Sequence, residues 1–378
     1  MIAILPAALT ALLTPLDAPD WRDPDAELTR VDEAVAAALE DALEGSPVPG
    51  GVAGIVEFES GVRAAAFGVR KAGDDAAVTI DDPVHIGSDT KAMTAVLVAR
   101  LVDKGLLEWD STLADVLPKL AKKADPGWGD VTVLQLLRHT SGAPANPSDW
   151  GAKEGQKLAK RRFAIAADAL SDAPRTEPGE AYEYSNLGYL LAGLFCEAAG
   201  DDEWEALIRR EVFEPLGMTG VGFGPPGTKG KVDAPWGHAF RVGRMRPVQA
   251  DNDPALGPAG TVHLPLEAWA RFAMEFSDGA AEASDFLEPE TRKKLLEVGV
   301  PSSSYACGWM VAERPWAGGK ALSHSGSNTM WFATAWIAPA RGRAYLVAVN
   351  AAGSGVPEAV DGAISALISL DAASKRGR

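Results

Sequence analysis

The sequence contains little cysteine, no long basic run and no internal repeat. Its two cysteines, Cys196 and Cys307, lie in apolar surroundings and lack the paired spacing of a disulfide framework or a zinc knuckle, so we expect both in the core. The formal net charge is −16, and basic residues occur only in short stretches such as SKRGR, which excludes a nucleic-acid partner. His85, His238 and His263 lack ligand spacing, so no metal and no other cofactor is predicted.

The first sixteen residues, MIAILPAALTALLTPL, are uncharged and mostly apolar, but this run is too short to cross a bilayer comfortably. It is typical of a signal-peptide core, although no basic segment precedes it. We therefore expect residues 1–20 to be a signal peptide on an exported protein, periplasmic or extracellular, with no stable membrane span. The alternative is a loose apolar arm, or a misassigned start, on a cytoplasmic protein.

What the sequence does contain is the composition of a globular protein, with 47% hydrophobic and 23% charged residues. Apolar residues spaced three and four apart predict a helix over residues 27–44. Two β-like runs follow at 52–58 and 61–69, joined by a turn-prone ESG segment. Helical periodicity then dominates from residue 88 to about residue 300, interrupted by loops rich in Pro and Gly.

The composition changes after residue 304, where three or four β-like runs precede a last helix near 357–371. Strands at both ends of the chain most simply join one antiparallel sheet. The predicted fold is therefore α/β (α+β): an antiparallel sheet flanked by N- and C-terminal helices and interrupted by an inserted all-helical domain. The predicted domains are 27–87 plus 301–371 for the sheet and 88–300 for the mainly helical insertion.

Ser88 and Lys91 stand three residues apart at the start of a predicted helix, in HIGSDTKAMTAVLVARL. On a helix this spacing places both side chains on one face, so hydroxyl and amine can meet. The helix N-terminus offers unpaired N–H groups and partial positive charge to an oxyanion beside Ser88. The alternative is that Ser88 or Asp89 caps the helix while Lys91 extends into solvent.

Two further motifs follow in the chain, Tyr184-Ser185-Asn186 before an apolar helix and His324-Ser325-Gly326 on a predicted strand. Together with SDTK, LLRHTSG and PLGMTGVGFG, they make the sequence resemble the serine β-lactamase and penicillin-binding-protein superfamily. The resemblance runs from about residue 27 to 371. It is strongest to the class C-like branch of β-lactamases, D-aminopeptidases, D-alanyl-D-alanine carboxypeptidases and esterases.

The resemblance implies a role for each motif residue. Ser88 is expected to be the acylated nucleophile, Lys91 its base partner, and Tyr184 the group that shares the proton between serine and leaving group. Asn186 is expected to hold the substrate carbonyl or to support Lys91. The stretch His324, Ser325, Gly326 and Ser327 is expected to form the strand along which substrate lies, with the N–H groups of Ser88 and Ser327 as the oxyanion hole.

The identity of the base stays open at this stage. A lysine with its ordinary pKa near 10.4 is almost wholly protonated at pH 7, so Lys91 must be desolvated to act as a base. If Lys91 instead stays charged, it stabilises a Tyr184 phenolate, which is then the base. His139 is expected to bond within its own turn.

The predicted function is that of a serine hydrolase, which cleaves a small-molecule ester, amide or peptide through an acyl-enzyme. No G-x-S-x-G motif occurs, which disfavours an α/β-hydrolase. His324 replaces the more usual lysine and is mostly neutral at pH 7, so we hypothesise a carboxylesterase or D-amino-acid peptidase with weak or no β-lactamase activity. The alternative is a non-catalytic or slow protein of the same fold that recognises penicillin or peptidoglycan peptides. Oligomeric state is not predicted.

Overall fold

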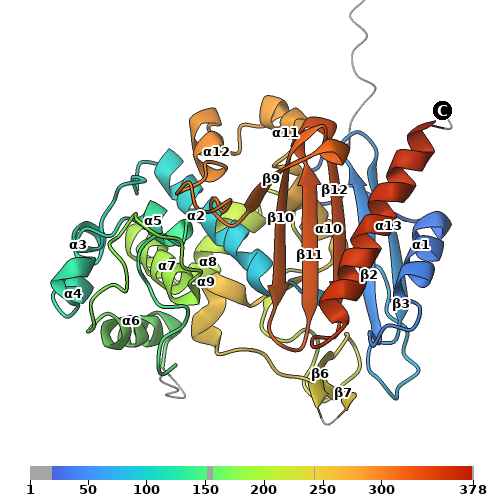
Figure 1. Ribbon diagram of the computed structural model, residues 1–378, viewed down its shortest axis with the longest axis horizontal. Coiled ribbons are helices and arrows are strands. Elements are labelled where there is room, and N and C mark those ends of the chain that lie inside the picture. Colours follow the sequence, from blue (N-terminus) through green and yellow to red (C-terminus); the bar gives the residue numbers. More distant parts are fainter. Residues whose placement is uncertain (1–18, 151–155, 242, 377–378) are drawn as a thin grey trace, which may run out of the picture.

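The computed structural model describes residues 19–150, 156–241 and 243–376 (Figure 1). The segment 1–18, which contains nearly all of the predicted signal peptide, lies outside the described residues. Cys196 and Cys307 are both buried, as predicted. In the described ranges no helix is long and apolar enough to cross a membrane.

One sheet of seven strands forms the centre of the fold (Figure 1). Its strands in spatial order are β1 (Thr29–Val31), β3 (Gly61–Gly68), β2 (Gly50–Glu57), β12 (Arg343–Val349), β11 (Phe332–Ala338), β10 (Gly319–Ser327) and β9 (Met310–Arg314). Every neighbouring pair is antiparallel except β1 and β3. Strands from both ends of the chain therefore join one sheet, which confirms the predicted topology.

The predicted N-terminal helix begins later than the sequence pattern indicates. Residues 29–31 form β1, which pairs in parallel with β3, and helix α1 spans Glu33–Leu43. Asp32 separates the two elements, because its carboxylate accepts hydrogen bonds from the backbone N–H groups of Ala34 and Val35 and so caps the helix. The sheet is mixed at this edge rather than wholly antiparallel.

Helices cover both faces of the sheet. On one face α1 and the last helix, α13 (Val356–Arg376), lie side by side and share a core with Ile55 of β2 and Val347 of β12 (Figure 1). On the other face α10 (Leu266–Met274) packs against β2 and β12, where the alternate residues Val56 and Leu346 join the larger core. Because successive side chains of a strand point to opposite faces of the sheet, β2 and β12 each contribute residues to both cores.

The segment between the two groups of sheet strands is mainly helical (Figure 1). Its other helices are α2 (Thr90–Asp103), α3 (Leu113–Val116), α4 (Pro118–Ala121), α5 (Val133–Leu137), α6 (Leu158–Ala169), α7 (Asn186–Gly200), α8 (Trp204–Ile208), α9 (Gly257–Gly260), α11 (Asp278–Ala283) and α12 (Pro289–Leu295). The buried helices α2 and α7 pack against each other, and α9 packs against both.

The insertion is not all-helical, which corrects the prediction. It contributes short strands to two small sheets: β5 (Gly222–Phe223) and β8 (Val262–Leu264) join β4 (Val84–His85), and β6 (Gly237–Arg241) pairs with β7 (Arg244–Val248). Strands β4, β5 and β8 are only two or three residues long, which is too short to give an alternating pattern in the sequence. Helix α10 lies within the predicted insertion but packs on the central sheet. The domain boundaries 27–87 plus 301–371 and 88–300 therefore stay a prediction.

Candidate active site

Ser88 lies in a single 3-10 turn, η1 (Gly87–Asp89), directly before α2. Neither Ser88 nor Asp89 caps the helix with its side chain, so the capping alternative is wrong. Lys91 is fully buried rather than extended into solvent, whereas Ser88 is partly exposed. The hydroxyl is thus accessible while its basic neighbour is not.

The turn at Ser88 is pressed against strand β10, and two glycines permit this approach. A Cβ atom at Gly326 would lie 1.9 Å from the carbonyl oxygen of Ile86 and 2.5 Å from the Ser88 nitrogen. A Cβ atom at Gly87, which has φ +52°, would lie 2.4 Å from the Ser327 nitrogen. The backbone nitrogens of Ser88 and Ser327 are therefore neighbours, as an oxyanion hole requires.

Lys91 places its amine against three oxygen atoms. Its Nζ lies 3.0 Å from Ser88 Oγ, 2.8 Å from Asn186 Oδ1 and 2.7 Å from the Ala259 carbonyl oxygen. A neutral amine has two N–H groups and one lone pair, and the two carbonyl-type oxygens can only accept. In the neutral form the lone pair of Nζ therefore faces the Ser88 hydroxyl.

The surroundings of Lys91 favour that neutral form. Burial lowers the pKa of Lys91 well below its ordinary value, and the nearby Asp89 opposes this shift only in part. Asp89 itself is buried, and its carboxyl accepts no hydrogen bond from another described residue. Burial raises the pKa of Asp89 well above its ordinary value, which favours the neutral acid form of this side chain.

Tyr184 is the third member of the group. Its side chain interacts with Ser88, and its ring centroid lies 4.9 Å from Lys91 Nζ. Burial raises the pKa of Tyr184 above its ordinary value, and the interaction with Ser88 only partly offsets this. Tyr184 is thus a protonated phenol at neutral pH. The structure brings Ser88, Lys91 and Tyr184, predicted from distant parts of the chain, into one cluster.

Asn186 is the first residue of α7, and the preceding Ser185 caps that helix by accepting from the Gly188 N–H at 2.8 Å. Ser185, and not Asn186, is therefore the residue that caps α7. Its Oδ1 accepts from Lys91, and its Nδ2 donates to Asn146 Oδ1 at 2.9 Å. Of the two predicted roles for Asn186, this geometry fits support of Lys91.

An aromatic cluster surrounds His139. Ring centroids of four of the chain's five tyrosines, Tyr182, Tyr184, Tyr189 and Tyr305, lie 4.4 to 5.8 Å from its ring. The expectation that His139 bonds within its own turn is wrong for the side chain, because His139 Nδ1 accepts from the Ser185 N–H at 3.0 Å. The imidazole thereby holds the backbone that carries Tyr184.

His324 lies on the inner side of β10, where its Nε2 contacts the Tyr305 hydroxyl at 3.3 Å. Burial, and then repulsion by Lys91, lower the pKa of His324 to about 3, so the ring is neutral at pH 7. Ser325 points to the opposite side and contacts Thr334 Oγ1 at 3.0 Å. The two side chains alternate across the strand, so only His324 faces the tyrosines.

The end of β10 is an open edge beside this cluster. Strand β9 pairs with β10 only up to the pair Ser323 and Met310, so residues 324–327 have no strand on that side. A groove of about 460 Å³ lies along this edge and reaches Tyr184 and His324. Among its described lining residues none is Lys or Arg, and Asp361 is the acidic one.

Comparison with known proteins identifies the fold family. The family model described as Beta-lactamase matches residues 35–369. The chain belongs to the beta-lactamase family. This confirms the superfamily that the motifs resemble.

Individual relatives of this beta-lactamase family member agree with that assignment. The chain is 28% identical to "Penicillin-binding protein 4" of Amycolatopsis lactamdurans over 80% of this chain and 81% of that protein. A class C beta lactamase from Rhodobacter sphaeroides superposes with a TM-score of 0.71 at 19% identity, over 89% of this chain and 99% of the other. A D-stereospecific amidohydrolase from Streptomyces sp. gives 0.68 at 22%, over 87% and 96%. The two structures show the shared fold.

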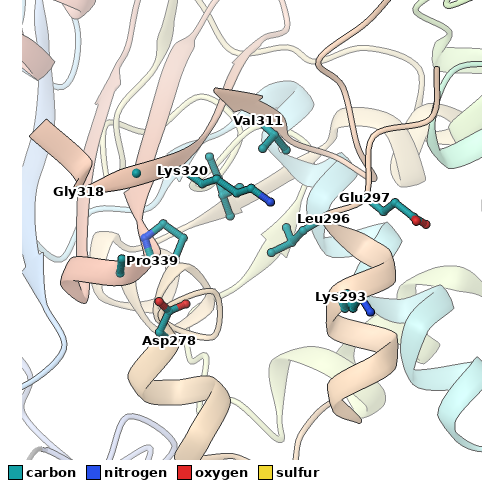
Figure 2. A pocket seen from close by; sticks show the side chains of 11 residues that line it. Asp278, Lys293, Leu296, Glu297, Val311, Gly318, Lys320 and Pro339 are labelled. Atoms are coloured by element: carbon teal, nitrogen blue, oxygen red, sulfur yellow. The ribbon is translucent and has the colours of Figure 1, made fainter. Parts of the chain in front are cut away.

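A second hollow of the beta-lactamase family protein lies away from Ser88. It measures about 510 Å³ and is bounded by α11, α12 and the β9–β10 turn (Figure 2). Side chains of both charges surround it, among them Asp278, Lys293 and Lys320, but none of the predicted site residues does. Across the part of the chain that the structure describes, no group of three or more His, Cys, Asp or Glu is placed to hold a metal ion.

Sequence reasoning missed four groups at the site: the Ala259 carbonyl, the Asn146 side chain, the His139 ring and the buried acid of Asp89. A backbone carbonyl such as that of Ala259 leaves no mark in the sequence. Asn146 lies in an irregular loop, far along the chain from its partner. Asp89 could have been found, because it is a carboxylate at the start of an almost wholly apolar helix.

Proposed function

We propose that this chain is a serine hydrolase that cleaves an ester or amide through an acyl-enzyme on Ser88. The observation that carries the proposal is the environment of Lys91 Nζ. This buried amine directs its N–H groups to Asn186 and Ala259 and its lone pair to Ser88 Oγ, 3.0 Å away. A base held in that position contributes roughly 10²–10⁴-fold to the rate.

In the proposed acylation step, Ser88 Oγ forms a bond to the substrate carbonyl carbon while its proton passes to Lys91 Nζ. The carbonyl oxygen becomes an oxyanion between the backbone N–H groups of Ser88 and Ser327, and each such donor contributes roughly 2.7–4 kcal/mol. The bond from carbon to the leaving oxygen or nitrogen then breaks. Tyr184 supplies the proton to the leaving group and regains one from Lys91, since its phenol is protonated and interacts with Ser88.

Deacylation reverses these roles with water as the nucleophile. The water oxygen bonds to the acyl carbon and gives its proton to the Lys91 and Tyr184 pair, and the bond from carbon to Ser88 Oγ breaks. Ser88 recovers its proton from the same pair and the acid is released. Lys91 rather than Tyr184 is the base in this proposal, because burial favours the neutral form of both side chains.

For the substrate we propose an uncharged or cationic ester or D-amino-acid amide, with weak or no β-lactamase activity. The neutral His324 offers no permanent cation to a substrate carboxylate. The groove along β10 contains Asp361 but, among the lining residues described, no Lys or Arg. A carboxylate bound there would therefore lack a cationic partner.

The test is incubation with a fluorophosphonate, followed by mass measurement, together with a substrate panel. We expect one adduct on wild type and on the surface variant Ser60→Ala, and none on Ser88→Ala. Short-chain aryl esters and D-alanyl anilides should be hydrolysed at least tenfold faster, by kcat/KM, than a chromogenic cephalosporin. A cephalosporin that is turned over faster than every ester and amide would refute the substrate proposal.

The alternative function is penicillin recognition without turnover, which the printed name of the Amycolatopsis relative supports. The same panel separates the two. A stable penicillin adduct on Ser88, without release of any ester or amide product over hours, would favour the binding protein. Multiple turnovers of an aryl ester would favour the hydrolase.

A further inference from the structure

Three buried polar residues near Ser88 have no place in the steps above. His85 is fully buried in β4, Asn328 is 1% exposed just after β10, and the Asp251 side chain, between β7 and η4 (Pro254–Leu256), is 3% exposed. They come from three distant parts of the sequence. Burying such groups costs free energy unless their hydrogen bonds are made.

Their hydrogen bonds form one continuous chain. The Gly87 N–H donates to His85 Nδ1 at 3.1 Å, which leaves the ring hydrogen on Nε2, facing Asp251 Oδ2 at 2.8 Å. On the other side, Asn328 Nδ2 donates to Asp251 Oδ1 at 2.8 Å. The Asn328 Oδ1 then accepts from the N–H groups of residues 330 and 331 at 3.1 and 3.0 Å.

The two ends of this chain lie next to the two oxyanion donors. Gly87 directly precedes Ser88, and Asn328 directly follows Ser327. The second end is a constrained turn, since Thr329 has φ +71°, which is unfavourable for a β-branched residue and needs support from its surroundings. Ser327 Oγ adds to that support by accepting from the Thr329 N–H at 3.0 Å.

We propose that the Asp251 carboxylate is a bridge that sets the spacing of the oxyanion hole, with His85 and Asn328 as its two arms. All three are positioning residues: they touch neither substrate nor nucleophile, and they act through the backbone at Gly87 and Asn328. The proposal rests on the proposed function, because an oxyanion hole matters only if Ser88 forms a tetrahedral adduct.

Both oxygens of the Asp251 carboxylate accept hydrogen bonds, one from His85 and one from Asn328. A single N–H group in place of either oxygen would therefore disturb the whole chain of hydrogen bonds. Asp251→Asn keeps the shape but places an amide N–H where only acceptors fit. If that N–H faces His85, the ring must move its own hydrogen to Nδ1, against the Gly87 N–H. If it faces Asn328, that amide must flip and point its NH₂ group at the backbone N–H groups of the turn. In either case two hydrogen-bond donors face each other, next to Ser88 or next to Ser327.

The experiment measures aryl-ester hydrolysis, inhibition by an arylboronic acid and thermal unfolding for wild type and variants. The boronic acid forms a boron–oxygen bond with Ser88 Oγ as the serine proton passes to Lys91, and the resulting tetrahedral adduct uses the oxyanion hole. For Asp251→Asn we expect kcat to fall and the boronate Ki to rise, each by about 10- to 100-fold, with KM within about threefold. A merely structural role would not link kcat to the boronate Ki in this way.

Two further variants sharpen the result. Glu275→Gln also neutralises a buried carboxylate, one that pairs with Arg22 and Arg292 away from Ser88, so it should lower the melting temperature but leave kcat and Ki within about twofold. Asn328→Asp replaces the NH₂ group that faces residue 251 with an acceptor oxygen, so the N–H group added by Asp251→Asn again has a partner. The double variant should therefore recover at least tenfold in kcat over Asp251→Asn alone, although Asn252 N–H, which donates to Asp251 Oδ1, loses its partner.

The bridge is refuted if folded Asp251→Asn keeps wild-type kcat and boronate affinity, or if the double variant is no better than the single one. Failure of the proposed function gives a different result, since wild type would then hydrolyse no ester and form no boronate adduct on Ser88. A variant effect on kcat and Ki together, in an active wild type, supports the bridge.

Discussion

Gly326→Ala tests the oxyanion hole directly, because Gly326 is the point where β10 meets the turn before α2. The added methyl group would lie 1.9 Å from the Ile86 carbonyl oxygen, 2.5 Å from the Ser88 nitrogen and 2.7 Å from Asp89 Oδ2. The first two are backbone atoms, which cannot rotate aside as a side chain can. The strand and the turn must therefore separate.

The size of the effect follows from that separation. An ordinary contact with the methyl carbon is about 3.5–4.0 Å long, so the Ile86 contact must lengthen by more than about 1 Å. A misplacement of about 1 Å at a reacting centre costs on the order of 10²-fold, and loss of one oxyanion donor costs roughly 10²–10³-fold, or about 2.7–4 kcal/mol. We expect kcat/KM for an aryl ester to fall by about 10²–10³-fold.

The matched control is Gly260→Ala. Its Cβ atom would meet the Gly87 carbonyl group at 3.5 Å and the Ser88 nitrogen at 3.7 Å, which are ordinary contacts in the same region. Both variants are assayed for ester hydrolysis after circular dichroism has shown that they are folded. A folded Gly326→Ala protein with kcat/KM within threefold of wild type would contradict the reasoning, as would an equal loss in Gly260→Ala.

Three other predictions concern buried charge. Because burial lowers the pKa of Lys91, kcat/KM should rise with pH through a pKa below the usual lysine value. Lys91→Met should abolish this rise and lower kcat/KM by about 10²–10⁴-fold. Burial raises the pKa of Asp89, so the folded state keeps a proton that the unfolded chain releases above about pH 3.9 and stability falls as pH rises. Asp89→Asn should therefore stabilise the protein more at pH 7 than at pH 4 in urea unfolding; equal effects would show that Asp89 is not buried as an acid. Arg162 is fully buried and pairs with Glu197 and Glu205, so Arg162→Met should cost about 3–5 kcal/mol in urea unfolding, and a loss below 1 kcal/mol would contradict its burial.

Local patterns predicted those parts of the site that lie on one element. The three-residue spacing of Ser88 and Lys91 places both on one side of a helical segment, and their atoms do meet. The β-like runs near both ends of the sequence likewise predicted that these strands share one sheet, because a lone hairpin is only marginally stable. Tyr184 and His324 were found only through the resemblance, since no periodicity links residues so far apart.

Tertiary contacts decided what the sequence patterns could not. The apolar spacing that starts at residue 27 extends the predicted helix too far, because residues 29–31 have a sheet edge available in β3. The His139 ring reaches Ser185 rather than its own turn, since the loop before α7 brings an unpaired N–H to it. Helix and strand periodicity describe one element at a time, so neither contact could be derived from it.

The pairing of β2 with β12 has a consequence for synthesis of the protein. Register pairs such as Gly51 with Val349 and Glu57 with Arg343 join segments that lie far apart in the sequence. At about 5–20 residues per second, the first hairpin leaves the ribosome well before its partner strand exists. During that interval β2 has a free, apolar edge, and such edges pair readily with other chains. Recovery of native protein from a cell should therefore depend on translation rate and chaperone supply more than its final stability suggests.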